Sequence, residues 1–364
     1  MLTKYDEFLC HQIVSTFDHP ATSAREWTER TWFCVHDTEG KVILVNSFGY
    51  YPNRNIIDTY VSITVEGKTV HTVRASRELR PAVDETVVGP FSYEIVEPLR
   101  KVKSSLDENE YGVSYDITFD GTFPPHEEDP QFARVKGRVE EHIVRYVQVG
   151  RPSGWIKVEG KTYQVDHENW RCERDHSWGV RRGGGVPEVG VQPGDIPTGY
   201  MHNFITFQFE NWGMTFHRRE DWDSTPLMFS GAIFYPADSG KPEVPLLDIE
   251  HNYSFRSDIR QLTGAEIKFT PAEGPQFTVT ARPLIHAYLK AGGMFGFRDF
   301  VHGMWMGPYF IDGHKIDLTD PQQLAEVHFI EDMASELRCG DETGYGIVEV
   351  VLIGKYPKYG YEGF

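Results

Sequence analysis

The sequence predicts an all-β protein built from antiparallel β-barrels or strongly curved sandwiches. Short runs rich in β-branched and aromatic residues recur along most of the chain. Turns rich in Gly, Pro and Asp separate these runs at intervals of about 8 to 15 residues, which is typical of such folds. At 364 residues the chain is long enough for two domains or one large β unit with a sizeable core.

Two stretches show helical spacing of apolar residues. Between residues 5 and 15, Phe8, Leu9, Ile13 and Val14 fall near the helical period, and a proline at position 20 ends the pattern. The second stretch, residues 320–332, follows the cap-like sequence Thr319-Asp320-Pro321. We therefore expect one short helix at the N-terminus and one late in the chain.

The predicted strands begin with two hairpins. The first joins residues 31–36 to 41–46 through a turn containing Gly40, and the second joins 60–65 to 69–73 through Glu66-Gly67-Lys68. Further strands are expected at residues 91–96, 112–119, 142–149, 155–158, 162–165, 204–209, 214–217, 228–235, 265–269, 277–281, 309–311, 315–317 and 346–354.

A segment rich in Gly and Pro, residues 183–197, marks the best domain boundary. We expect a helical or extended lead-in over residues 1–24, a first β-domain over 25–190 and a second over 191–364. Clefts between domains are common ligand sites, so residues just before this boundary are candidates for a ligand site.

Composition excludes several functions. The formal net charge of −18 argues against nucleic-acid binding, which needs clustered Lys and Arg. The four cysteines form no Cys-x-x-Cys pair, so free thiols in a reducing cytoplasm are expected. The N-terminus lacks a signal-peptide pattern, and no apolar run approaches the roughly 18 residues of a membrane span. We predict a cytoplasmic protein without a membrane span, and a homodimer is compatible with the sequence.

The most unusual run is Arg174-Asp175-His176-Ser177-Trp178-Gly179-Val180-Arg181, in which cations, a carboxylate, an imidazole and an indole occur without a hydrophobic period. Neighbours on an extended chain face opposite sides, so His176 and Trp178 should share one face. Asp175, Arg174 and Arg181 should lie on the other face or at its edge. Histidine supplies acid–base chemistry near neutral pH, and an indole face stabilises a cation. Alternatively, the run forms an Arg–Asp network between domains, with Trp178 in the core.

Other chemistries have weaker support. The sequence has no Gly-x-Ser-x-Gly elbow, Walker loop or dinucleotide-binding fingerprint. The histidines do not fall at a recognised metal-ligand spacing, so neither a metal nor an organic cofactor is expected. Residues 295–306, which include Phe297 and Trp305, mix aromatic side chains with methionine. Such a segment forms core or the wall of a ligand pocket.

Three sequence runs carry a resemblance to a known superfamily. They are Arg174-Asp175-His176-Ser177-Trp178-Gly179-x-Arg181, Arg151-Pro152-Ser153-Gly154 and Glu26-Trp27-x-x-x-Thr31-Trp32-Phe33. Through them the chain resembles the lipocalin-like superfamily of carotenoid 1,2-hydratase (hydroxyneurosporene synthase), which includes kievitone hydratase and fungal decalin-forming Diels–Alderases. The resemblance spans nearly the whole chain and implies two lipocalin-like, or calycin-like, β-barrels side by side, with an apolar ligand pocket between or within them.

The resemblance also implies roles for residues of the run. In the hydratase branch, the matching histidine and tryptophan assist protonation of an alkene and stabilise the carbocation that water captures, which assigns these roles to His176 and Trp178. That branch also uses a downstream Tyr-x-Asp pair. Here Tyr200 is followed two residues later by His202, so Asp175, His202 or Glu210 would supply the proton.

We therefore expect a cofactor-independent lyase or isomerase, such as a hydratase or dehydratase, acting on a hydrophobic alkene-containing molecule of terpenoid, steroid or polyketide-like type. His176, Asp175 and Trp178 are the expected catalytic residues, and Arg174 and Arg181 orient the site. The expected substrate-binding residues are Tyr200, His202, Glu210, Phe297 and Trp305. The alternatives are a non-catalytic carrier of an apolar ligand and a pericyclase or other cyclase.

Overall fold

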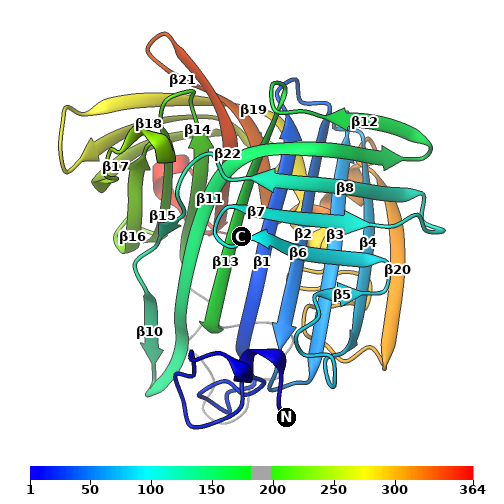
Figure 1. The fold of residues 1–364 in the computed structure, drawn as a ribbon. Coiled ribbons are helices and arrows are strands. Elements are labelled where there is room, and N and C mark those ends of the chain that lie inside the picture. Colours follow the sequence, from blue (N-terminus) through cyan, green and yellow to red (C-terminus); the bar gives the residue numbers. More distant parts are fainter. Residues whose placement is uncertain (182–197, 364) are drawn as a thin grey trace.

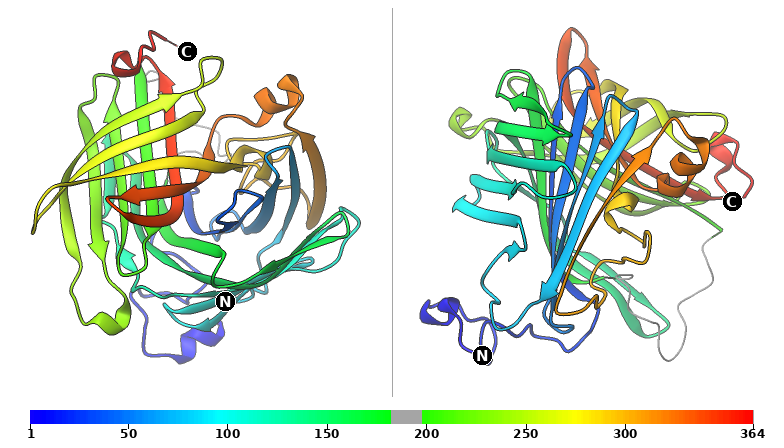
Figure 2. Two further views of the ribbon diagram at one scale, coloured as in Figure 1. Left: turned by 90° about the horizontal axis from the view of Figure 1, so that it is seen from above. Right: turned by 90° about the vertical axis from the view of Figure 1, so that its right-hand side faces the viewer.

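The structure, a computed structural model, describes residues 1–181 and 198–363. Two curved antiparallel β-structures lie side by side, as Figures 1 and 2 show. Each has its own cluster of buried apolar residues. The predicted all-β architecture is confirmed.

The first structure is a 14-stranded sheet with the main order β20-β4-β3-β2-β1-β13-β11-β8-β7-β6-β5, and β9, β10 and β12 also pair with β11. Its strands are β1 (Trp27–Asp37), β2 (Val42–Tyr51), β3 (Ile56–Val65), β4 (Thr69–Glu78), β5 (Val87–Val88), β6 (Phe91–Glu97), β7 (Lys101–Leu106), β8 (Val113–Asp120), β9 (His126–Glu127), β10 (Gln131–Val135), β11 (Arg138–Val158), β12 (Lys161–Val165), β13 (Trp170–Val180) and β20 (Tyr309–Asp317).

The second structure is a closed barrel in which each strand pairs with its neighbours in the order β14-β15-β16-β17-β18-β19-β21-β22. Its strands are β14 (Gly199–Gln208), β15 (Gly213–Asp221), β16 (Pro226–Phe234), β17 (Val244–Phe255), β18 (Leu262–Pro271), β19 (Phe277–Tyr288), β21 (Glu331–Cys339) and β22 (Glu342–Gly354).

Strand β11 curls the first sheet around its core. Its first half pairs with β13, and its second half, from Arg151 to Val158, pairs with β8. Gly154, at the start of this second half, has φ 134°, and a Cβ there would lie 1.9 Å from the carbonyl oxygen of Asp116. Only glycine permits this backbone approach, so the bend is specified by the residue type.

The two structures pack on each other through a third buried cluster. Trp32, Cys34 and Tyr60 of the first sheet lie in it with Phe204 and Ile347 of the barrel. The Trp32 and Phe204 rings meet edge to face, with centroids 5.8 Å apart. One face of β1 to β3 is thus covered by the barrel, and residues on both faces of β2 and β3 are therefore buried.

The prediction of an N-terminal helix is wrong except for a single turn. Only Lys4–Glu7 is helical, as the 3₁₀ helix η1. Phe8, Leu9 and Val14 are exposed, so the apolar stripe has no surface to bury against, and a short helix without such packing is unstable.

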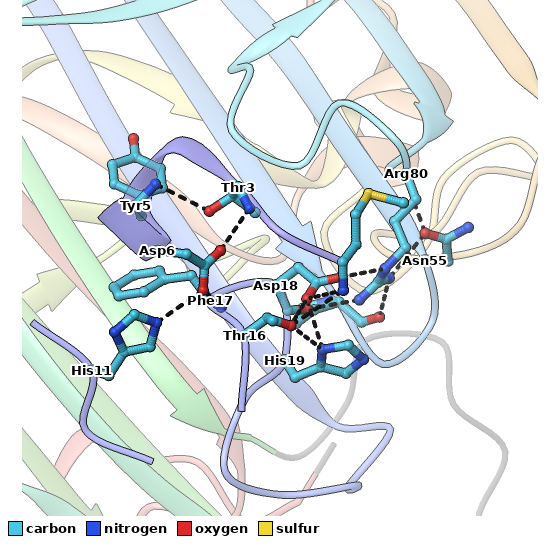
Figure 3. A network of polar contacts seen from close by, with 12 residues as sticks. Thr3, Tyr5, Asp6, His11, Thr16, Phe17, Asp18, His19, Asn55 and Arg80 are labelled. Carbon is cyan, nitrogen blue, oxygen red and sulfur yellow. Dashed lines mark hydrogen bonds and ion pairs between the residues drawn. The ribbon is translucent and has the colours of Figure 1, made fainter. Parts of the chain in front are cut away.

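Polar contacts fix the lead-in instead (Figure 3). Asp6 accepts hydrogen bonds from the backbone N–H groups of Thr3 and Phe17. Asp18 accepts a hydrogen bond from the N-terminal amine at 3.0 Å and pairs with Arg80 at 3.3 Å.

The second predicted helix is confirmed as α1 (Pro321–Val327), and the Asp320 side chain caps it by accepting from the Gln322 N–H. The remaining helices are the short 3₁₀ turns η2 (Ala237–Ser239), η3 (Leu289–Gly292) and η4 (Pro357–Tyr359). Among the described residues, no helix is long and apolar enough to cross a membrane.

The predicted domain boundary, between residues 190 and 191, lies outside the described residues and stays a prediction. One strand crosses the expected division. Strand β20, from the second half of the sequence, pairs with β4 of the first sheet over residues 309–317. The segment that leads to it, which includes η3, lies over the junction between the two structures (Figure 2).

Candidate functional site

A cavity of about 580 Å³ lies between the first sheet and the barrel. The first sheet contributes side chains from β1, β11 and β13, the barrel contributes side chains from β14 and β22, and residues 289–302 close part of the wall. The polar lining side chains include Arg30, Arg145, Asp175, Ser177, Arg181, His202, Arg219, His302 and Glu349.

Strand register determines which residues of the run face this cavity. Ser177 of β13 lies opposite Arg30 on β1 and opposite Arg145 on β11. Two residues earlier on β13, Asp175 lies opposite Trp32 on β1. Because alternate residues share a face, Asp175 and Ser177 point into the cavity together with Arg30, Trp32 and Arg145.

His176 and Trp178 lie on the opposite face of β13. Their ring centroids are 5.4 Å apart, which confirms that the two side chains share a face. His176 Nε2 lies 2.8 Å from Glu29 Oε1, and its Nδ1 lies 3.4 Å from the Tyr146 hydroxyl. Neither side chain is among the described residues that line the cavity. The catalytic roles of His176 and Trp178 stay predictions. These two side chains lie on the face of β13 opposite Asp175, away from the cavity lining.

We expected Arg174 on the same face of the strand as Asp175. It lies instead on the face that carries His176. It donates hydrogen bonds to the Tyr146 hydroxyl at 3.2 Å and to Gln148 Oε1. The strict alternation of the strand explains the error, since residues 174 and 176 are two apart. Arg181 follows the prediction and lines the cavity with Asp175.

The predicted binding residues separate into two groups. Tyr200 and His202 of β14 line the cavity. Glu210 is exposed beyond the end of β14, Phe297 is buried in a separate cluster with Tyr288, and Trp305 is exposed. Binding roles for these last three stay predictions at positions away from the cavity lining.

A pair of carboxyl groups at the barrel wall is the strongest chemical feature of the cavity. Glu349 of β22 lines the cavity, and Asp332 of β21 is fully buried beside it. The Trp32 Nε1–H donates to Asp332 Oδ2 at 2.8 Å. Burial raises the pKa of Glu349 to about 7. Burial and the neighbouring Glu349 charge raise the pKa of Asp332 well above its ordinary value. The pair therefore holds at least one proton at neutral pH.

Two histidines extend from this pair into the protein. His202 Nε2 lies 3.4 Å from Glu349 Oε1, His202 Nδ1 lies 3.3 Å from His217 Nε2, and His217 Nδ1 lies 3.3 Å from Glu128 Oε2. Burial and neighbouring arginines lower the pKa of His202 to about 3. Burial also lowers the pKa of His217 to about 3. Both rings are therefore neutral, and one consistent tautomer lets each accept a proton on one side and donate on the other.

Asp175 and two of the arginines form ion pairs around the cavity. Arg145 lies between Glu128, at 3.6 Å, and Asp175, at 3.4 Å, and it also lies over the Phe204 ring. Burial raises the pKa of Asp175. Arg219 pairs with Glu141 and donates to Gln131 Oε1.

Sequence reasoning missed Glu349, Asp332, Arg30 and Arg145. No motif marks Glu349, because it lies within the apolar strand predicted at residues 346–354. A lone carboxylate inside an otherwise buried apolar strand is costly unless it has a function, and this signal could have found it. Arg30 and Arg145 lie in ordinary strand sequence, so only the register brings them to Ser177.

Comparisons with known proteins support the fold. Among solved structures, an AttH-like protein from Nitrosomonas europaea has a TM-score of 0.53 at 11% identity, covering 89% of this chain and 92% of that chain. CghA, solved with Sch210972, has a TM-score of 0.50 at 10% identity, covering 91% and 89%. Kievitone hydratase from Nectria haematococca has a TM-score of 0.43 at 12% identity, covering 89% and 88%.

The first two likenesses support the all-β fold that the sequence predicted. A comparison with curated protein sequences gave no significant match. One family description matches residues 2–362, which is nearly the full length. The chain belongs to this family, a family of unknown function designated DUF8625.

Proposed function

We propose that the protein is a cofactor-independent acid–base enzyme, a hydratase, dehydratase or isomerase, that acts on a hydrophobic alkene-containing molecule bound in the cavity. The observation that carries the proposal is the Glu349 carboxyl in the cavity wall, which holds a proton together with the buried Asp332 carboxyl beside it. A carboxyl group that is half protonated near pH 7 can both give and take a proton there.

In the proposed reaction, Glu349 gives its proton to one alkene carbon of the substrate. For hydration, water adds to the other alkene carbon and gives a proton back to the Glu349 carboxylate. For isomerisation, the carboxylate instead removes a proton from a neighbouring carbon. Dehydration is the reverse of hydration. Asp332 keeps the shared proton within reach, and the Trp32 indole fixes its orientation. The chain through His202 and His217 to Glu128 offers a route by which the proton on Glu349 is exchanged.

The size and lining of the cavity support a terpenoid, steroid or polyketide-like substrate. A volume of about 580 Å³ lies within the range of sites for drug-sized ligands. Apolar side chains from both β-structures and from residues 289–302 form much of the wall, and they are Ile143, Phe204, Leu289, Met294, Val301, Val351 and Ile353. Polar side chains from both β-structures, among them Ser177 and Glu349, line the same cavity and supply groups that could orient such a molecule.

The experiment starts from the small molecule that copurifies with the protein, identified by mass spectrometry. Incubation in D₂O then reports proton transfer to carbon as incorporated deuterium. We expect the wild-type protein to exchange or convert the molecule, and Glu349→Gln to slow this by about 100-fold or more, the usual contribution of a general acid. Glu250→Gln is the matched control, because Glu250 lies on the outside of the same barrel and pairs with Lys268.

Three outcomes would contradict the proposal. A recovered molecule that the wild-type protein neither changes nor deuterates would favour a carrier. Full turnover in Glu349→Gln together with its loss in His176→Ala would move the chemistry to the opposite face of β13. Cyclisation that survives both substitutions would indicate a pericyclase, in which the shape of the cavity does the work.

A further inference from the structure

Two cavity arginines differ from the others in lacking a carboxylate partner. Arg30 and Arg181 both line the cavity. Within residues 1–181 and 198–363, no acidic group lies within ion-pair distance of either guanidinium, whereas Arg145 and Arg219 both have such partners. The Nε atoms of all four arginines are buried without a hydrogen-bond partner among the described residues, so the missing carboxylate is what sets Arg30 and Arg181 apart. Buried donors without partners are rare, because each costs free energy in the unliganded protein.

Backbone register brings the two arginines to the same place. Arg30 lies directly opposite Ser177 across the β1–β13 pair. Arg181 follows β13 and turns back, so that its Nη2 donates to the Ser177 hydroxyl at 2.9 Å. The Arg181 guanidinium thus contacts Ser177, and Arg30 stands directly across from the same serine in the cavity wall.

The groups around Arg30 do not neutralise it. His302 Nδ1 lies 2.9 Å from Arg30 Nη2, and burial holds the pKa of His302 well below its ordinary value, so the ring is a neutral acceptor. Asp58 attracts Arg30 from beyond ion-pair distance, and its carboxylate accepts the Gly303 N–H. Burial and the nearby charges of Arg30 and Arg145 lower the pKa of Arg181 to about 9. At neutral pH both side chains stay charged and repel each other.

We propose that Arg30 and Arg181, with the Ser177 hydroxyl, bind the negatively charged group of an amphipathic organic anion whose apolar body lies along the rest of the cavity. Guanidinium groups are well suited to this, because their planar donors match carboxylates and similar anions. The inference rests on the cavity of the proposed function as the ligand site. It adds that the substrate carries an acidic group at one end.

Two fluorescent probes of nearly the same shape test the proposal. 8-Anilinonaphthalene-1-sulfonate is an apolar anion, and N-phenyl-1-naphthylamine is the same ring system without the sulfonate. We expect the wild-type protein to bind the anionic probe more tightly. Arg30→Gln and Arg181→Gln should each weaken the anionic probe by about tenfold or more, in line with loss of one charged hydrogen bond, and change the neutral probe by less than about twofold.

Controls separate a lost anion site from a misfolded cavity. Arg282→Gln removes a positive charge from an exposed ion pair on β19 and should leave both probes unchanged. Binding of the neutral probe reports an intact cavity in each variant. If Arg30→Gln does not fold, Arg181→Gln and the charge-preserving Arg30→Lys still decide the question, and Arg30→Lys should keep most of the anion preference.

Equal weakening of both probes in the folded variants, or no preference of the wild-type protein for the anion, would overturn the anion site. Neither result bears on proton transfer, which the deuterium exchange of Glu349→Gln tests separately. Failure of this inference is thus distinguishable from failure of the proposed function.

Discussion

Replacing Glu349 by Gln should change how the stability of the protein depends on pH. The Gln side chain has the shape of a protonated Glu and cannot ionise, so the variant resembles the wild-type protein in its protonated form. Burial raises the pKa of Glu349 from 4.5 to about 7 on folding. Between these two values the folded wild-type protein holds a proton that the unfolded chain has lost, so this group stabilises the fold at low pH and loses that effect as pH rises towards 7.

The expected magnitude follows from the two pKa values. For a carboxyl with a pKa of 4.5 unfolded and about 7 folded, the contribution to the free energy of unfolding is about 2.5 kcal/mol greater at pH 5 than at pH 8. His202 and His217 act in the opposite direction, because their lowered pKa values cost stability as pH falls below about 6.5. Asp332, whose pKa is raised by burial and by the Glu349 charge, acts in the same direction as Glu349. The wild-type profile alone therefore mixes these effects, and the comparison with the variant reports the contribution of the Glu349–Asp332 pair.

Urea unfolding followed by tryptophan fluorescence at pH 5 and pH 8 provides the assay. We expect Glu349→Gln to match the wild-type protein within about 1 kcal/mol at pH 5 and to be more stable by about 2 to 3 kcal/mol at pH 8. Glu250→Gln, in an exposed ion pair, should show no such pH-dependent difference. Parallel pH profiles for the wild-type protein and Glu349→Gln would show that Glu349 ionises normally, and the proposed proton donor would lose its basis.

Two substitutions test the face of β13 that lines the cavity. Asp175→Asn should leave the free energy of unfolding at pH 7 within about 1 kcal/mol of the wild-type value or raise it, because burial raises the pKa of Asp175 and Arg145 keeps Glu128 as a partner. Urea titration measures this, and a loss of about 2 kcal/mol or more would contradict it. Gly179→Ala should cost about 2 kcal/mol or more, since Gly179 has φ 138° and a Cβ would lie 2.0 Å from the His142 carbonyl oxygen. A melting temperature equal to that of the wild-type protein would exclude the strain.

The sequence predicted the architecture well because strand signals are local. Alternation, β-branched residues and Gly turns give the hairpins their places, and residues 31–46 form the expected β1–β2 pair. The N-terminal helix failed because its apolar residues have no partner surface, and the packing of a surface is a property of the whole fold. Local sequence also predicted that His176 and Trp178 share a face, but it could not say which face of the strand meets the barrel.

The same limit applies to the candidate site. Residues 174–181 contribute side chains to both faces of one strand. The residue types alone therefore made His176 and Asp175 equal candidates for catalysis. Only pairing with β1 and β11 shows that Asp175 and Ser177 meet Arg30 and Arg145 in the cavity. Glu349 comes from a strand more than 170 residues later, with no motif to mark it. Such long-range assembly is set by strand order in two β-structures, which no short window contains.

The charges around the cavity also bear on the intermediate of the proposed reaction. Four arginines line the cavity, and Arg30 and Arg181 lack an acidic partner within ion-pair distance among the described residues. A carbocation about 5 Å from one such charge would be destabilised by about 3 kcal/mol at an effective dielectric constant near 20, and an anion would be stabilised by as much. This repulsion exceeds the roughly 0.5 to 2 kcal/mol that an aromatic face offers a cation. Within the proposed function, these charges favour an alkene that is conjugated to a carbonyl over an isolated alkene, because the negative charge of an enolate can then rest near the arginines.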